Sequence, residues 1–367
     1  MLKKDKDKFL LLDFGRGSIK GIIFQPIKEK IKILNFQEEK IQKYSIFNGK
    51  DFEIDIIKKP AEKVINQLGK KEEILKLSKI LFFPPDILRA EIFNLSFKRE
   101  RKDKKIEKEE GRKIHQFILN ETERKLFKKE GNQIEILKKK VLIEKISGYK
   151  VPLILGFRNG ELSFKVLVIF YSQTYSNFFK KIKKNLGLEN SKIFHPVESL
   201  INLIKRKSLE NNQVFIDIGE KNTLISFFKE KEIESIINFP LGGLDFTKEL
   251  SKILILKENE AEILKENFSQ KKLSPNTEMK LKKIFQSPLN LWLKNFREKV
   301  GINLFANFYL FGGGSLFPLI KEELEREIKK EKIKFLLSDN LPIENKTNIK
   351  FSPKETSSLL KVFYSND

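Results

Sequence analysis

Short apolar runs separated by polar turns open the chain. Phe9–Phe14 ends in an Asp-x-Gly turn, Ser18–Phe24 follows it, and Ile31–Phe36 completes a group of three. Apolar runs of this length bounded by turn residues predict strands, so we expect an antiparallel meander at the start of a domain. Helical spacing then predicts a helix over Ala61–Leu68, and Ile80–Phe83 predicts a strand that two prolines stop.

The same order of elements returns in the second half of the chain. Val214–Ile218 again ends in Asp-x-Gly, and Thr223–Phe228 and Ile233–Phe239 complete a second meander. The 367 residues are enough for two or more lobes. The repeated unit therefore predicts an α/β fold with two similar lobes that face a cleft.

Periodicity also predicts the remaining elements. The expected helices are Ile114–Leu126, Ser176–Leu186, Pro196–Ile204, Phe246–Ile255, Asn259–Phe268, Met279–Val300, Phe317–Lys330 and Thr356–Phe363. The expected strands are Val141–Ile146, Leu162–Tyr171 and Phe308–Phe311.

Composition supports a folded core and excludes several kinds of chemistry. Apolar residues make up 40% of the chain and aromatic residues 11%, which argues against global disorder. Because the chain has no cysteine, disulfides, thiolate nucleophiles and thiolate metal sites are excluded. Its two histidines, His115 and His195, are too few for a His-rich metal site.

The net charge of +23 has two explanations. One is attraction to nucleic acid or to an anionic membrane surface. The other is a compositional bias toward Lys, Ile, Phe and Asn, which is favoured because the positive charge is spread along the whole chain. Even the most charged stretch, residues 97–113, interleaves Lys and Arg with Glu, as is typical of a solvated loop. We therefore expect no nucleic-acid partner.

No uninterrupted apolar stretch approaches the ~18 residues of a membrane-spanning helix, and the first apolar run is too short for a signal peptide. We expect a cytoplasmic protein, either free or attached peripherally to the inner face of the cell membrane.

The two acidic turns are the first candidates for a binding site. Asp13 and Asp217 each end the first strand of a lobe, and such carboxylates can hold Mg²⁺ through bound water. Glycines in the turns let backbone N–H groups approach an anion closely. The residues expected to contact phosphate are Gly15, Arg16, Gly17, Ser18, Lys20, Gly219 and Thr223. Each turn taken alone is also a common structural turn.

Two further segments complete the candidate site. Gly312, Gly313, Gly314 and Ser315 lie between an apolar strand and a helix, where they permit close approach of a flat ligand or a phosphate. The alternative is a flexible loop, but the apolar residues on both sides predict a tight buried turn instead. Glu262 and Lys265 share a helix face and can bind ribose hydroxyls, or form an ordinary surface ion pair.

In this order the four segments resemble the phosphate-, adenosine- and ribose-contacting motifs of the actin, heat-shock chaperone and sugar-kinase superfamily. Residues 238–247, which include Gly242 and Gly243, resemble the "PvGG…T" segment of FtsA and the pilus protein PilM, and Ala261–Lys265 resembles their "AExLK". The resemblance covers nearly the whole chain. It implies duplicated ribonuclease-H-like lobes with Mg²⁺ and ATP between them, and adds Gly242 and Gly243 to the nucleotide-binding residues.

Residues 146–162 resemble a stretch of FtsA, which implies an inserted SHS2-type (1C) subdomain. The implied organisation is lobe one over residues 1–83 and 168–205, the insert over 84–167, lobe two over 206–246 and 305–350 with a second subdomain over 247–304, and a C-terminal helix over 351–367 that returns to lobe one.

The sequence also departs from the family pattern. Glu220, Lys221 and Asn222 replace the usual Gly-Gly-Thr of the second phosphate turn and bring a carboxylate toward the phosphates. His195 occupies the position of a water-orienting Glu or Gln, either as a base or as a polar cap before a helix. We therefore expect slow or no ATP hydrolysis, with Asp13, Asp217 and His195 as the candidate catalytic residues. The expected amphipathic membrane helix of FtsA is replaced by a short final helix.

The resemblance implies a nucleotide-gated adaptor that recruits a tubulin-like division protein to the membrane, as FtsA does, with self-association into filaments. The alternative is a PilM-like platform of type IV pilus assembly that binds a peptide from an inner-membrane partner. A small-molecule kinase of the same fold is a third possibility, and no segment resembles a sugar or acetate site.

Overall fold

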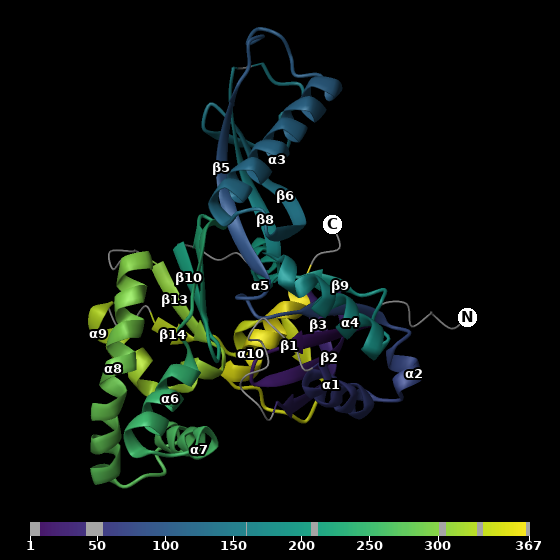
Figure 1. The fold of residues 1–367 in the computed structure, drawn as a ribbon. Coiled ribbons are helices and arrows are strands. Elements are labelled where there is room, and N and C mark those ends of the chain that lie inside the picture. Colours follow the sequence, from purple (N-terminus) through teal and green to yellow (C-terminus); the bar gives the residue numbers. More distant parts are fainter. Residues whose placement is uncertain are drawn as a thin grey trace. The chain divides into compact units, whose positions relative to one another are not determined.

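The structure is a computed structural model that describes residues 8–41, 54–158, 160–206, 212–300, 306–328 and 333–364 (Figure 1). The chain divides into two compact units. The larger unit combines Met1–Asp86 with Lys180–Asp367, and the smaller unit is Ile87–Phe179. Helix α4 (Ser176–Leu186) spans the boundary between them.

The larger unit contains two sheets. The first has six strands in the order β15-β3-β2-β1-β4-β9 and the second has five in the order β12-β11-β10-β13-β14. The strands of the first sheet are β1 (Phe9–Phe14), β2 (Ser18–Ile27), β3 (Lys30–Lys40), β4 (Ser78–Phe82), β9 (Lys192–Phe194) and β15 (Ile343–Asn345). Those of the second are β10 (Asn212–Ile218), β11 (Thr223–Lys229), β12 (Glu232–Phe239), β13 (Ala306–Phe311) and β14 (Ile333–Phe335).

The two sheets share one topology. In the first, β2 pairs antiparallel with β1 and β3, and β1 and β4 pair in parallel on the other side. In the second, β11 pairs antiparallel with β10 and β12, and β10 and β13 pair in parallel. The predicted duplication of strand, Asp-x-Gly turn, strand and strand is therefore confirmed.

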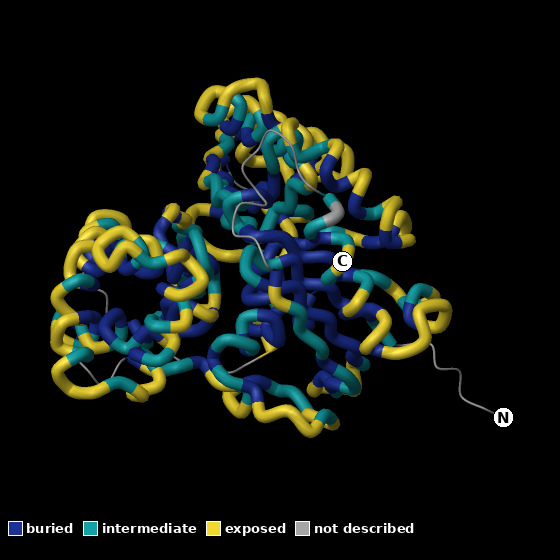
Figure 2. The backbone as a smooth tube through the Cα atoms, turned by 60° about the horizontal axis from the view of Figure 1, so that its bottom comes forward, coloured by how far each residue is buried: buried dark blue, intermediate teal, exposed yellow. Residues whose placement is uncertain are grey.

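Helices cover both sheets. Those of the larger unit are α1 (Ile54–Leu68), α2 (Lys71–Ile74), α5 (Pro196–Arg206), α6 (Gly243–Leu254), α7 (Glu258–Ser269), α8 (Pro275–Val300), α9 (Pro318–Glu327) and α10 (Pro353–Leu360), with short 3-10 turns η2 (Gly313–Leu316), η4 (Ser338–Asn340) and η5 (Lys361–Phe363). Helix α1 packs against β2 and β3, whereas α8 contacts β12 and α9 contacts β14. The buried parts of the tube in Figure 2 follow these strands and the helix faces turned toward them.

Close packing in each lobe depends on small or aromatic residues. A Cβ at Gly21 would lie 2.4 Å from Val64 of α1, so only glycine lets this helix lie so near β2. In the second lobe Trp292 of α8 is fully buried, stacks on Phe296 and meets Phe239 edge to face. These contacts set the distance of α1 from β2 in the first lobe and of α8 from β12 in the second.

The smaller unit is a four-stranded sheet covered by one long helix. Its elements are β5 (Arg89–Lys98), α3 (Lys108–Glu130), β6 (Ile134–Ile146), β7 (Tyr149–Val151), β8 (Glu161–Ser172) and η1 (Gln173–Tyr175), with strand order β5-β8-β6-β7. Ile114, Ile118 and Leu126 of α3 belong to the buried cluster of this unit. The guanidinium of Arg99 binds both carboxylate oxygens of Glu110 at 2.7 and 2.8 Å, which fixes the start of α3 against the end of β5.

The C-terminal helix α10 contacts elements of both lobes. It packs against α5, β13 and η2 of the larger unit, and lies in Figure 1 as the yellow helix beside β1. Ser352 caps its N-terminus and exchanges hydrogen bonds with Glu355, which is a capping box. Polar residues of α10 lie next to the ends of β1 and β10, where Ser358 contacts Asp13 and Ser357 contacts Asp217.

Most predicted elements are confirmed, but their ends shift, by as much as seven residues at the starts of α1 and β6. The structure adds strands that the hydrophobic pattern did not predict, namely β5, β7, β9, β14 and β15. Four of these have only three residues, and β5 is largely half-exposed. Lys329 and Lys330, the expected end of the helix that begins near Phe317, lie outside the described residues. The subdomain boundaries given above remain predictions.

None of the helices in the described part of the chain is both long enough and apolar enough to span a bilayer.

Candidate functional site

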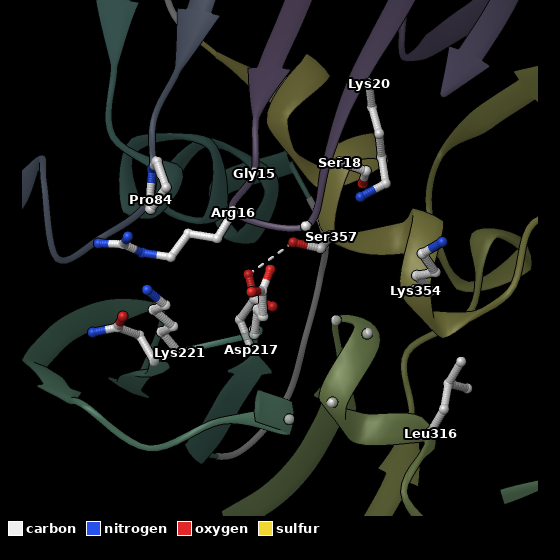
Figure 3. Close-up of a pocket in the computed structure, with 18 of the residues that line it drawn as sticks. Gly15, Arg16, Ser18, Lys20, Pro84, Asp217, Lys221, Leu316, Lys354 and Ser357 are labelled. Carbon is white, nitrogen blue, oxygen red and sulfur yellow. Dashed lines mark hydrogen bonds between the residues drawn. The ribbon is translucent and has the colours of Figure 1, made fainter. Parts of the chain in front are cut away.

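A pocket of about 580 Å³ opens where the two acidic turns of the larger unit meet, a volume typical of small-ligand sites (Figure 3). Most of the residues predicted from the sequence line it. These are Asp13, Gly15, Arg16, Gly17, Ser18, Lys20, Asp217, Gly219, Gly243, Glu262, Lys265, Gly312, Gly313 and Gly314. Thr223, Gly242, Ser315 and His195 are not among the lining residues.

Strand pairing explains why the two aspartates face the pocket. Asp13 is the fifth residue of β1 and lies opposite Lys20, and Asp217 lies opposite Leu224 in the matching pair of the second lobe. Because side chains alternate across a strand, the neighbours Phe14 and Ile218 point into the cores. The same alternation therefore carries one carboxylate from each lobe to the pocket.

Both carboxylates are already engaged by the C-terminal segment. Lys361 Nζ lies 2.6 Å from Asp13 Oδ2, and the Ser358 hydroxyl donates to the same oxygen. The Ser357 hydroxyl donates to Asp217 Oδ2 at 2.8 Å, which is the dashed contact in Figure 3. None of the three was identified from the sequence. Helical spacing was the available signal, because positions 354, 357, 358 and 361 fall on one face of a helix.

The two aspartates differ in their ionisation. Burial opposes the charge of Asp13, but the ammonium groups of Lys361 and Lys20 and the hydrogen bonds from Lys361 and Ser358 outweigh it and hold the pKa of Asp13 below its usual value. Burial raises the pKa of Asp217, and the charge of Asp13 acts in the same direction. The Lys361 ammonium group therefore stabilises the charge of both carboxylates, but it is hydrogen-bonded only to Asp13.

The turn at residues 15–20, the predicted first phosphate turn, carries cations that protein carboxylates already pair. Lys20 Nζ lies 3.7 Å and Lys354 Nζ 3.0 Å from Glu38 Oε1, and both lower the pKa of Glu38 against the effect of its burial. The guanidinium of Arg16 pairs with Asp86 and extends toward Pro84, on the other side of the pocket from Lys20 in Figure 3. The turn keeps its backbone geometry for an anion, but its charge is largely balanced within the chain.

Glu220 places a carboxylate against the same turn. A Cβ at Gly17 would lie 2.7 Å from Glu220 Oε2, so the side chain reaches across from the second lobe into the first phosphate turn. Both carboxylate oxygens are shielded from solvent and accept no hydrogen bond from the described residues. Burial raises the pKa of Glu220 to about 7, opposed by the charges of Lys221 and Arg16. The sequence predicted this approach of a carboxylate, and the structure brings it to the turn of the opposite lobe.

The glycine corner fits tightly around the second acidic turn. Gly312 has φ +86°, and a Cβ there would lie 2.2 Å from Asp217 Oδ1. A Cβ at Gly314 would lie 2.5 Å from the Ile218 side chain. Ser315 is buried and its hydroxyl donates to the Gly312 carbonyl at 2.7 Å, so it holds the turn together. The corner is a tight turn, as predicted, and not a flexible loop.

Glu262 and Lys265 form a network at the opposite wall. Lys265 Nζ lies 2.7 Å from Glu262 Oε2 and donates to the Gly243 carbonyl at 2.8 Å and the Thr247 hydroxyl at 2.7 Å. Their side chains are 24% and 12% exposed, which is too buried for an ordinary surface ion pair. The pair is therefore part of the pocket wall and fixes the start of α6 to α7.

Thr223 points into the core. It pairs with Ile218 and so shares the buried face of the strand pair rather than the face of Asp217. Its hydroxyl donates to the Leu241 carbonyl at 2.8 Å and accepts from Trp292 Nε1 at 2.9 Å. Gly242 lies beside it, where a Cβ would meet the Glu220 carbonyl at 2.5 Å. Both residues support the turn without lining the pocket.

His195 is fully buried before α5. Its Nδ1 accepts from the Val197 N–H at 3.1 Å, and its own N–H donates to Glu198 at 3.0 Å, as a polar cap does. Burial, and after it the charge of Lys361, lower the pKa of His195 to about 3, so the imidazole is neutral near pH 7. Of the two roles considered from the sequence, these contacts fit the cap.

The arrangement does not fit the predicted magnesium ion. Water-bridged Mg²⁺ is held by free carboxylate oxygens in a near-octahedral shell. Asp13 Oδ2 instead carries the Lys361 ammonium group, and Asp217 has Ser357 on one oxygen and the Gly312 backbone against the other. A protein cation occupies the position predicted for the metal.

The sequence matches no protein-family model and no curated protein. A chain of the PilM–PilN type IV pilus biogenesis complex aligns with a TM-score of 0.68 at 13% identity, over 97% of this chain and 95% of the other. The ethanolamine utilization protein EutJ from Carboxydothermus hydrogenoformans aligns at 0.48 and 12% identity, over 99% and 91%. An MreB protein of Spiroplasma citri bound to ADP aligns at 0.48 and 9% identity, over 98% and 97%.

Together with the matching topology of the two sheets, the first alignment establishes the fold. The chain has the two-domain fold of the actin-like ATPases, which confirms the predicted α/β two-lobe class.

Thr223 provides a test of this geometry. In Thr223→Val the Trp292 N–H loses its acceptor and the Leu241 carbonyl its donor, so we expect the free energy of unfolding to fall by about 1–3 kcal/mol. Trp292 is the sole tryptophan, so urea unfolding followed by its fluorescence reports directly on the second lobe. Thr223→Ser, which keeps the hydroxyl, is the matched control and should lose less. Equal stability of Thr223→Val and the parent chain would contradict the buried network.

Glu220 predicts a pH dependence of stability. Its pKa is raised from 4.5 to about 7 in the folded chain, so ionised Glu220 destabilises the fold. The parent chain therefore has its full stability with respect to this group below pH 4.5 and loses it as the pH rises through 7. Glu220→Gln stays neutral, and we expect its stability relative to the parent chain to rise by about 3 kcal/mol between pH 4 and pH 8. Urea unfolding followed by Trp292 fluorescence across this range measures the difference. Glu322→Gln, at an exposed position of α9, is the control. A difference that stays constant with pH rules the prediction out.

Proposed function

We propose that this chain binds an adenine nucleotide between its two lobes and acts as an assembly or adaptor protein, with slow or no hydrolysis. The observation that carries the proposal is the convergence of two acidic turns, the triple-glycine corner and the Glu262–Lys265 pair on one pocket. In the actin-like fold these are the regions expected to contact phosphate, adenosine and ribose.

The adenosine half of the pocket supports this proposal most directly. The Lys265 ammonium group and the Thr247 hydroxyl both donate to the Glu262 carboxylate, so Glu262 is held in place to accept hydrogen bonds from ribose hydroxyls. The Gly312–Gly314 corner has no side chains and allows close approach of the base, and Leu316 adds a 40% exposed apolar surface.

The phosphate half supports binding rather than turnover. Catalysis of phosphoryl transfer depends on positioned cations and an oriented water molecule. Lys20 and Arg16 are paired with protein carboxylates, Glu220 adds negative charge beside Gly17, and His195 lies outside the lining residues. With a raised pKa, Glu220 also lets phosphates approach more easily below pH 7, when its carboxyl group is protonated.

Nucleotide binding is tested by isothermal titration calorimetry with ADP and ATP. We expect wild-type binding and a loss of about tenfold or more in Lys265→Met, because the ammonium group that holds the Glu262 carboxylate in place for the ribose hydroxyls is removed. Lys294→Met, on the exposed side of α8, should bind as wild type does. Phosphate release should stay below ~0.01 s⁻¹, under the usual range of enzymes. Absence of nucleotide binding to wild type, or rapid turnover, would refute the proposal.

For the partner, we propose a segment of an inner-membrane protein, bound as in a PilM-like platform. The alignment with a chain of the PilM–PilN complex over nearly all of both chains supports this choice. The alternative is the FtsA-like role first suggested by the sequence, in which the partner is a tubulin-like division protein and the smaller unit, as an SHS2-type subdomain, contacts neighbouring subunits in filaments. Either role places the chain in the cytoplasm near the membrane.

The two partner classes are separated by a pull-down with the full-length chain. We expect it to retain a pilus-type N-terminal peptide from the same genome and not the tubulin-like protein, with and without ATP. Retention of the tubulin-like protein alone would favour the FtsA-like role. Sedimentation with ATP, and with anionic vesicles, then checks for filaments and for membrane attachment.

A further inference from the structure

The C-terminal segment brings its own cation to the centre of the pocket. Lys354, Ser357 and Lys361 line the pocket, and Ser358 reaches Asp13 beside them. These residues form one face of α10 and the turn that follows it. The Lys361 ammonium group lies 2.6 Å from Asp13 Oδ2, at the position where the actin-like resemblance predicts magnesium.

The surroundings of Lys361 are those of a fixed group rather than of a surface lysine. The residue is 7% exposed, and its partner Asp13 is 4% exposed. Its Nζ also lies 5.7 Å from the centre of the Phe82 ring, so an aromatic face stabilises the charge. A buried ammonium group needs such partners, because an unpaired charge in the interior is strongly unfavourable.

The backbone of the C-terminal segment is hydrogen-bonded to both lobes. The Lys361 carbonyl accepts from the Ser199 hydroxyl of α5 at 3.1 Å. Leu360, Val362 and Phe363 around it are buried, and the Pro353 carbonyl accepts from the Gly312 N–H at 3.0 Å. The segment is packed as part of the core, and moving it out of the pocket would expose these apolar side chains.

We propose that the Lys361 ammonium group is the resident cation of the two facing aspartates, so that this cleft binds its nucleotide without a divalent metal. The proposal rests on the proposed nucleotide binding and adds to it the form of the ligand, which is a nucleoside diphosphate or triphosphate without bound Mg²⁺. Lys361 supplies positive charge at Asp13, and Lys20, Lys354 and Lys221 lie around the space for the phosphates.

Charge explains why the two cations exclude each other. Mg²⁺ at Asp13 would lie next to an ammonium group bound to the same carboxylate, and like charges so close repel strongly in a pocket shielded from water. Asp217 offers little compensation, because Ser357 already occupies one of its oxygens and Gly312 closes on the other. Mg²⁺ also requires six oxygen ligands in an octahedral shell, whereas an ammonium group has only three N–H donors to satisfy.

The metal alone provides the first test, without any nucleotide. Mn²⁺ is added to the nucleotide-free wild-type protein, and free Mn²⁺ is followed by electron paramagnetic resonance. We expect no Mn²⁺ site that depends on the aspartates in wild type, and a new site in Lys361→Met, which removes the ammonium group from Asp13. Lys354→Met, from the same helix face but paired with Glu38, should gain none. A wild-type Mn²⁺ site that is lost in Asp217→Asn overturns the proposal, and this result needs no folded Lys361 variant.

Nucleotide binding provides the second test. We expect the affinity of wild type for ADP to agree within about threefold in Mg²⁺ and in EDTA, and the affinity of Lys361→Met in EDTA to fall at least about tenfold and to recover with Mg²⁺. Strict dependence of the wild type on Mg²⁺ overturns the proposal. If the wild type binds no nucleotide in either buffer, the proposed function fails, and the Mn²⁺ measurement alone decides on Lys361.

Hydrogen exchange of residues 353–363 separates this role from an autoinhibitory one. A resident cation predicts that ADP leaves exchange in this segment unchanged or slows it. Faster exchange with ADP would mean that the segment leaves the pocket to admit the nucleotide, and would overturn the proposal.

Discussion

The centre of this structure is a concentration of negative charge: two carboxylates, the buried Asp13 and the half-buried Asp217, face one pocket from the ends of two central strands. Ionised groups removed from water require a compensating charge. Here the compensation comes from Lys361, with Ser357 and Ser358 as additional donors. The last helix of the chain is therefore needed to complete the site that the first strand begins.

This compensation gives the pocket a particular character. Its wall contains alternating charges that are mostly paired within the chain, such as Lys20 and Lys354 with Glu38, and Lys265 with Glu262. Paired charges are held in fixed positions, which suits recognition of a polar ligand more than rapid chemistry on it. Glu220 is the exception, since its carboxylate has no hydrogen-bond partner in the described part of the chain and its pKa lies near neutrality. The pocket therefore combines a fixed ion pair, Glu262 with Lys265, on one wall with a carboxyl group beside Gly17 whose charge follows pH.

The sequence was most informative where structure is local. A strand that ends in Asp-x-Gly and is followed by two more strands can be recognised from neighbouring residues, and both copies are present with the predicted order. The edge strands were missed because three residues carry too little periodic signal, as in β14 and β15. Thr223 illustrates a different difficulty. Whether it faces the pocket or the core depends on the pairing of β10 with β11, and a shift of one residue reverses the answer.

The sequence by itself determined the α/β class, the two lobes, the acidic turns and the glycine corner, because turn chemistry and hydrophobic alternation are written in consecutive residues. Tertiary structure alone decided which groups meet. Lys361 and Asp13 are separated by nearly the whole chain, and Glu220 meets Gly17 across the two lobes. Contacts of this kind depend on how packed lobes close on each other, and no local pattern encodes the distance between them.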